Sequence, residues 1–149
     1  MNQSPARRAT DGQGSVLPQA KQVFQNAYFT VLVEERLRIA VTVRTDKPFG
    51  SVAALQGGIG ELGDALDRMG RSRYALLVDV RAGPGRNDPD FEAALQRLLP
   101  RWLGGFRRVG VLVRSVAGLM QIQRHAKQDG IERWPSTDEA ALVKYLTQP

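Results

Sequence analysis

Residues with reactive side chains are few in this chain. His125 is the single histidine, and the basic residues Arg124 and Lys127 flank it. A general base needs a positioned substrate, and a serine nucleophile needs a base beside it. Ser115 lacks the G-x-S-x-G setting of a hydrolase nucleophile. We therefore expect a surface histidine at position 125, no catalytic residues and no enzymatic activity.

Metal and cofactor motifs are equally sparse. The chain has no cysteine, which excludes disulfides and thiolate metal sites, and its other ligand-type residues lack metal-site spacing. Residues 58–63 match the dinucleotide pattern G-x-G-x-x-G, and Asp79 follows at a suitable distance. A helical pattern already begins at Val52, however, whereas this motif should open a helix directly after a strand. We expect no metal and no cofactor, with a nucleotide-using enzyme as the least favoured hypothesis.

The glycine-rich loop at residues 83–87 follows an apolar segment and precedes a helix. Its backbone amides, Arg86 and the helix N-terminus could hold an anion. Asp88, Asp90 and Glu92 oppose an anion at that place. We interpret the loop as a plain connection in which Asp88 caps the following helix.

Basic residues are concentrated in one part of the chain, which has a formal net charge of +6. No acidic residue occurs between positions 93 and 128. Such a region can attract phosphates, acidic proteins or anionic lipids, unless its arginines cap helices and pair with acids elsewhere in the fold. The residues of this hypothetical anion-binding surface are Arg101, Arg107, Arg108, Arg124 and Lys127.

The hydropathy pattern indicates the elements that position these residues. Residues 1–22 are polar and predict a flexible tail, and residues 23–149 predict a single domain. Period-two alternation predicts strands, and apolar residues spaced by three and four predict helices. The expected strands cover 28–33, 37–43, 74–80, 109–113 and 131–134, and the expected helices cover 52–69, 89–103, 116–128 and, from a Ser136–Glu139 capping box, 136–146.

This element order predicts an α/β fold. An antiparallel hairpin opens a mixed, mostly parallel sheet, and amphipathic helices lie mainly on one side of it. The predicted helix at 52–69 contains Gly57, Gly58, Gly60 and Gly63. Each glycine costs a helix up to about 1 kcal/mol, so we expect a close approach to the sheet or to a partner there.

The chain lacks signals for export. No apolar stretch approaches the roughly 18 residues that span a bilayer, and residues 1–14 lack the pattern of a secretory signal. We therefore expect a cytoplasmic protein without a membrane span.

Three segments give the chain a resemblance to the STAS and SpoIIAA-like domains, the anti-sigma-factor antagonist family. They are Leu76–Val80 (LLVDV), Val111–Ser115 (VLVRS) and the acidic start of the last helix at 136–146, and the resemblance covers about residues 27 to 147. It implies a mixed sheet and regulation through protein contacts. Some members are switched by phosphorylation at a hydroxyl residue that begins the second helix. Residues 87–90 (NDPD) offer no hydroxyl, so Asp88 either caps the helix or mimics a phosphorylated state.

The resemblance favours a non-enzymatic regulatory module of bacterial signalling that binds another protein. A homo-oligomer remains open, and binding of nucleic acid or an anionic surface through the basic region is the alternative. By analogy with the family, the expected partner-binding residues are Gly60, Glu61, Asp64, Arg86, Asn87 and Asp88.

Overall fold

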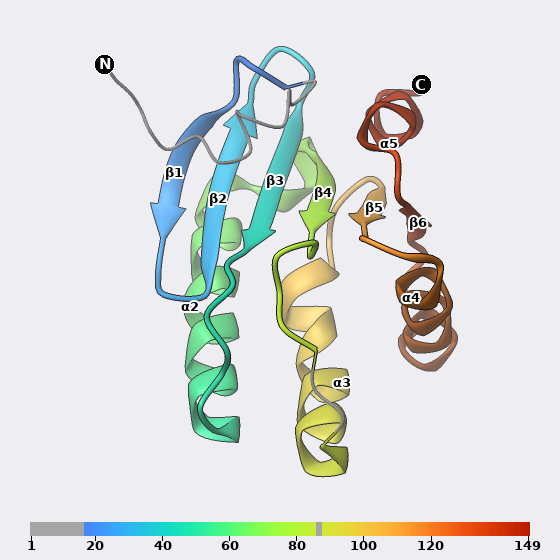
Figure 1. Ribbon diagram of the computed structural model, residues 1–149. Coiled ribbons are helices and arrows are strands. Elements are labelled where there is room, and N and C mark those ends of the chain that lie inside the picture. Colours follow the sequence, from blue (N-terminus) through green and yellow to red (C-terminus); the bar gives the residue numbers. More distant parts are fainter. Residues whose placement is uncertain (1–16, 86–87) are drawn as a thin grey trace.

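The computed structural model describes residues 17–85 and 88–149 (Figure 1). In chain order the elements are β1 (Lys21–Gln25), β2 (Phe29–Glu34), β3 (Ile39–Arg44), α2 (Val52–Met69), the short 3-10 helix η2 (Arg71–Arg73), β4 (Ala75–Asp79), α3 (Pro89–Leu103), β5 (Val109–Leu112), α4 (Val116–Asp129), β6 (Trp134–Ser136) and α5 (Glu139–Leu146). This is the α/β fold that the hydropathy pattern predicts.

All six strands form one sheet in which the spatial order follows the chain order. The strands β1, β2 and β3 pair antiparallel, and β3, β4, β5 and β6 pair parallel. The helices α2, α3 and α4 provide the crossovers between the parallel strands (Figure 1). The prediction of an antiparallel hairpin that opens a mostly parallel sheet is therefore confirmed.

The ordered fold begins earlier in the chain than the sequence indicates. The expected tail ends at residue 22, but β1 starts at Lys21 and Leu17 is only 5% exposed. β1 is an edge strand whose side chains are mostly exposed, so its sequence KQVFQ has no apolar period to reveal it. The structure thus adds one strand to the predicted set.

Two other boundaries differ from the prediction for local reasons. Leu37 belongs to the turn between β2 and β3, because the Glu34 carboxylate accepts hydrogen bonds from the amides of Arg36 and Leu37. Near the C-terminus, β6 starts at Trp134 rather than at residue 131. The N-cap of α5 is Asp138, whose carboxylate accepts the amide of Ala141 at 3.2 Å, so Ser136 is not the capping residue.

Both faces of the sheet are covered. One core packs the sheet against α2, α3 and α4, and its buried residues include Phe29, Leu76, Val111 and Trp102. A smaller core on the other face packs α5 and Leu17 against the alternate residues of the strands. Of the described α-helices, α2, α3 and α4 therefore lie on one side, as expected, and α5 covers the opposite side.

The helix glycines divide into two groups. A Cβ at Gly58 would lie 2.9 Å from the ring of Tyr28, and one at Gly63 would lie 2.5 Å from the guanidinium of Arg101. Gly58 thus lies close to the residue that precedes β2, in line with the predicted approach to the sheet, whereas Gly63 faces α3, which the prediction did not include. A Cβ at Gly57 or Gly60 would meet nothing within 4 Å, so packing within the chain does not explain those two glycines.

Arg71 holds the end of α2 against the end of α3. Its Nη1 donates to the carbonyl oxygens of Trp102 and Gly104, and its Nη2 donates to those of Arg101 and Gly63. Carbonyl groups at a helix C-terminus lack partners within the helix, and the guanidinium supplies them here. This contact fixes the position of α3 on the sheet.

Within the described ranges, no helix has both the length and the apolar character needed to cross a bilayer.

Candidate functional site

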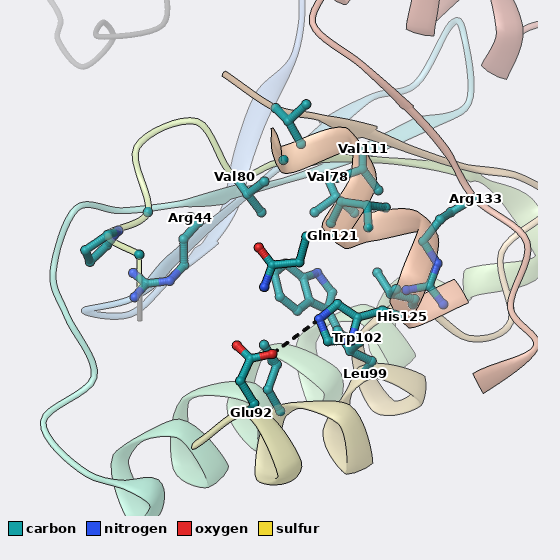
Figure 2. A pocket seen from close by; sticks show the side chains of 18 of the residues that line it. Arg44, Val78, Val80, Glu92, Leu99, Trp102, Val111, Gln121, His125 and Arg133 are labelled. Carbon is teal, nitrogen blue, oxygen red and sulfur yellow. Dashed lines mark ion pairs between the residues drawn. The ribbon is translucent and has the colours of Figure 1, made fainter. Parts of the chain in front are cut away.

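A pocket of about 410 Å³ lies between α3, α4 and the sheet. Its base is formed by β4, β5 and the residues that follow them, with Val78, Val80, Val111 and Val113 among the lining side chains (Figure 2). The loop that follows β4 contributes Gly83 to the rim. Ligands of open α/β sheets bind at this carboxyl end of the parallel strands, in pockets of about this size.

The two helices that enclose the pocket are packed differently. α3 buries Phe91, Ala94, Leu99 and Trp102 against the sheet. No residue of α4 is buried, although apolar residues such as Ile122 face the core in part. The pocket thus has one firmly packed wall and one lightly packed wall.

Trp102 connects the pocket to the interior of the sheet. Its Nε1 donates to Oγ1 of Thr42 at 3.0 Å, and its ring meets that of Phe29 edge-on with 4.9 Å between centroids. Both residues of the hydrogen bond are buried. A buried indole needs such a partner, and the bond fixes the indole against the pocket.

His125 faces the pocket, so the expectation of a surface histidine is wrong. Its side chain is 13% exposed, its Nε2 lies 3.6 Å from Oε1 of Glu92, and its Nδ1 contacts Oε1 of Gln96 (Figure 2). Burial lowers the pKa of His125, an effect that Glu92 opposes. Both partners lie on α3, about thirty positions away in sequence, where no local pattern could reveal them.

A buried ion pair closes the pocket beyond His125. Arg133 donates to Oδ1 of Asp129, and these side chains are 1% and 4% exposed. Arg133 also donates through Nε to the carbonyl of Ile131 at 3.0 Å. Oδ2 of Asp129 is the one buried side-chain oxygen or nitrogen without a hydrogen bond in the described chain. The pair ties the end of α4 to the segment that enters β6.

Arg44 lies on the side of the pocket opposite His125 (Figure 2). It is 7% exposed, and its Nη1 donates to the carbonyl oxygen of Thr45 at 2.7 Å. Its guanidinium carbon is 4.2 Å from the centroid of the Phe49 ring. Burial lowers the pKa of Arg44, and Asp46 acts in the opposite direction. Sequence patterns do not reveal this residue as a candidate, because an arginine at the end of a strand is common in proteins of any function.

The four expected partner-binding residues that the structure describes do not line the pocket. Glu61 accepts a hydrogen bond from Asn26 at 2.9 Å, and Asp64 forms an ion pair with Arg101 at 2.5 Å. Asp88 caps α3 by accepting the amides of Asp90 and Phe91. Gly60 is half-buried and faces open space. Arg86 and Asn87, the other two members of this group, lie outside the described residues.

The basic residues are only partly available for a ligand. Arg101 pairs with both Asp64 and Asp67 of α2, and Arg108 donates to the carbonyls of Tyr145, Gln148 and Pro149. These two arginines serve structural contacts, as the alternative interpretation of the charge pattern expects. The exposed members of the group are Arg107, Arg124 and Lys127.

The remaining candidates have structural partners. Asp79 pairs with Arg81 at 2.8 Å and accepts its backbone amide at 3.1 Å. Ser115 caps α4 by accepting the amide of Gly118 at 3.4 Å. Among the residues placed by the structure, no group of three or more histidine, aspartate and glutamate side chains could hold a metal.

Comparisons with family models, curated proteins and solved structures found no significant match to this chain. The pocket geometry therefore carries the functional argument.

Proposed function

We propose that this protein is a non-enzymatic regulatory module that binds a small apolar molecule in the pocket between α3, α4 and the sheet. The single observation that carries the proposal is the cavity of about 410 Å³ beside a mainly apolar set of side chains. Ligand sites are clefts of about 300–1,000 Å³ that are lined mainly by apolar side chains with a few polar groups. The size and the lining of this pocket therefore suit a small ligand.

The polar groups of the site support binding rather than catalysis. His125 is engaged with Gln96 and Glu92, and Arg133 is engaged with Asp129. The best candidate nucleophile, Ser115, caps the start of α4, whereas His125 lies near the end of that helix. These groups close the pocket and hold its walls together, which suits a site that retains a ligand.

The light packing of α4 supports a regulatory role. Because α4 buries no residue completely, an occupant beneath it would contribute much of the apolar contact on that side. Ligand binding would then change how firmly α4 is held, and a partner could sense that change at its outer surface. The resemblance to STAS domains, in which protein contacts regulate, agrees with this proposal.

A fluorescent apolar probe tests the proposed function. Trp102 lines the pocket and Trp134 is 41% exposed, so a Trp134→Phe protein reports on the pocket alone. We expect the neutral dye N-phenyl-1-naphthylamine to bind saturably and to quench Trp102. Gln121→Phe, which fills the pocket, should weaken dye binding by at least about tenfold.

The matched control is Gln123→Phe, an exposed position on the same helix outside the lining. It should leave the dye affinity unchanged. Absence of saturable binding, or equal effects of the two variants, would overturn the proposed function.

A protein partner on α2 is a second candidate, favoured by one observation. Gly60 faces open space, so a helix-weakening glycine is retained there without an intrachain packing reason. A partner backbone could approach closely at this point, beside Glu61 and Asp64. If Gly60→Arg leaves the capture of a purified partner unchanged, this surface is wrong. Nucleic-acid binding is less favoured, because Arg101 and Arg108 are engaged within the chain.

A further inference from the structure

Arg44 is a buried cation on the pocket wall, and Asp46 influences its charge without forming an ion pair with it. Within the described chain, the ion pairs do not include it. Its Nη1 donates to the carbonyls of Thr45 and, at 3.4 Å, Tyr28, while Nε and Nη2 make no hydrogen bond to any described residue. A buried guanidinium is costly when its charge is unpaired. The edge of the guanidinium formed by Nε and Nη2 is therefore available to an anion.

The surroundings of Arg44 fix its position. Its guanidinium is stacked on Phe49, and its Nη1 is held by the carbonyl of Thr45. A Cβ at Gly83 would lie 2.9 Å from Cγ of Arg44, so the loop after β4 leaves room for the arginine stem only because position 83 is glycine. The arginine is thus oriented before any ligand arrives, which lowers the entropic cost of binding.

Three other charged residues of the pocket have partners among the described residues, whereas Arg114, which also lines the pocket, is exposed to water. Glu92 lies beside His125, and Arg133 pairs with Asp129. The Asp88 carboxylate occupies the amides at the start of α3, so the helix N-terminus is not open to a ligand anion. Among the described residues, Arg44 is therefore the buried cation of the pocket that can recognise an anion, while the amides of Asp90 and Phe91 are already bonded to Asp88.

We propose that the pocket binds a monocarboxylate that carries an apolar chain or ring, with its carboxylate on Nε and Nη2 of Arg44. The apolar part would lie against Leu95, Leu99 and Val111, which line the pocket. A planar carboxylate matches two adjacent N–H groups of a guanidinium. This inference rests on the proposed function, because it names the ligand class of the same pocket.

The charge count favours a carboxylate over a phosphate monoester. Among the described lining residues, Arg44 provides the one buried positive charge outside an ion pair, Arg114 is exposed to water, and Glu92 lies on the pocket wall as well. A dianion would leave one negative charge without a partner in a largely apolar space, which is costly. A carboxylate is neutralised by Arg44 alone.

A pair of ligands with different head groups tests the inference. 4-Phenylbutanoate and 4-phenylbutan-1-ol share an apolar part and differ in the head group. With the Trp134→Phe protein and Trp102 emission as the readout, we expect the acid to bind at least about tenfold more tightly than the alcohol. Arg44→Gln retains a donor for the carbonyl of Thr45, and it should abolish that preference.

Arg97→Gln is the matched control, because Arg97 is exposed on α3 and does not line the pocket. It should keep the preference for the acid. Equal binding of the acid and the alcohol to the parent protein would overturn the inference, whether or not the Arg44→Gln protein folds. A preference for the acid that persists in a folded Arg44→Gln protein would overturn it as well. If N-phenyl-1-naphthylamine binds but neither phenyl ligand does, the carboxylate inference fails and the proposed function stands. If the dye does not bind either, both fail.

Discussion

The Nε1–H group of Trp102 donates to Oγ1 of Thr42 at 3.0 Å, which joins α3 to the middle of β3 in the protein interior. Thr42 is fully buried and Trp102 is 6% exposed, so water cannot replace either partner. The same indole lines the pocket. This hydrogen bond therefore links the stability of the fold to the shape of the proposed binding site.

Because Trp102 and Thr42 share this hydrogen bond, we expect their substitutions to have non-additive effects on the free energy of unfolding. Trp102→Phe leaves the Thr42 hydroxyl without its partner, and Thr42→Val leaves the indole without its acceptor. Each should lower the free energy of unfolding by about 1–3 kcal/mol, with a further cavity cost for Trp102→Phe. The double variant should lose clearly less than the sum of the two, as measured by urea unfolding. Simple additivity would show that the hydrogen bond does not contribute.

Because of His125, we expect the folded protein to lose stability in mild acid. Its pKa is lowered from 6.5 in the folded protein, mainly by burial, while Glu92 and Asp129 raise it and Arg133 and Arg124 lower it further. The unfolded chain therefore binds a proton before the folded one does, so the free energy of unfolding falls as the pH drops below about 6.5. The loss should level off once the folded-state pKa is passed. We expect the midpoint of urea unfolding to be lower at about pH 5.5 than at about pH 7.5.

His125→Gln is the control for this pH effect, since glutamine does not titrate. The difference between the two pH values should be much smaller in that variant. Asp67 has a lowered pKa through its bond to Arg71, but its contribution is lost only at lower pH, near the carboxylate range. An unchanged pH difference in His125→Gln would assign the effect to other groups.

We expect replacement of the single side chain of Arg71 to lower the free energy of unfolding strongly, because it lies at the ends of α2 and α3. Arg71→Met removes donors from four carbonyl groups, and the arginine side chain is 12% exposed. The expected loss is about 2–4 kcal/mol in the free energy of unfolding. Arg68→Met, at an exposed position in the last turn of α2, should change it by less than about 0.5 kcal/mol. Similar effects of the two substitutions in thermal or urea unfolding would contradict the role of Arg71.

We expect replacement by alanine at Gly60 and at Gly58 of α2 to change the stability of the protein in opposite directions. Gly60→Ala should stabilise the protein by up to about 1 kcal/mol, because its Cβ meets open space and alanine favours a helix. Gly58→Ala places a Cβ 2.9 Å from the Tyr28 ring and 3.3 Å from the Phe49 ring. Overpacking of this kind costs about 1–3 kcal/mol, so the alanine at 58 should be the less stable variant. Equal melting temperatures would contradict the packing described for Gly58.

The fold was largely predictable because its signals are local. The alternation in β3, the apolar run of β4 and the capping residue Asp88 each reflect interactions within a few residues. β1 escaped prediction because an exposed edge strand has no buried face. Of the predicted surface, Glu61 and Asp64 have intrachain partners on other elements, which no sequence spacing reveals.

The pocket could not be predicted, for a physical reason. Its distinctive residues come from separate elements: Arg44 from the end of β3, Glu92 from α3 and His125 from α4. Each has an ordinary role by its local pattern, and only the tertiary fold brings them to one cavity. The light packing of α4 is likewise invisible in a sequence whose helical period is regular.

The most direct test of the proposed pocket is the indole N–H region of a ¹H–¹⁵N NMR spectrum during titration with 4-phenylbutanoate. The chain has two tryptophans, one buried in the pocket wall and one exposed on β6, so the spectrum contains an internal control. We predict that the Trp102 indole signal shifts saturably while the Trp134 signal stays in place. A Trp102 signal that does not move at saturating ligand, or equal shifts of both signals, would contradict binding in the pocket.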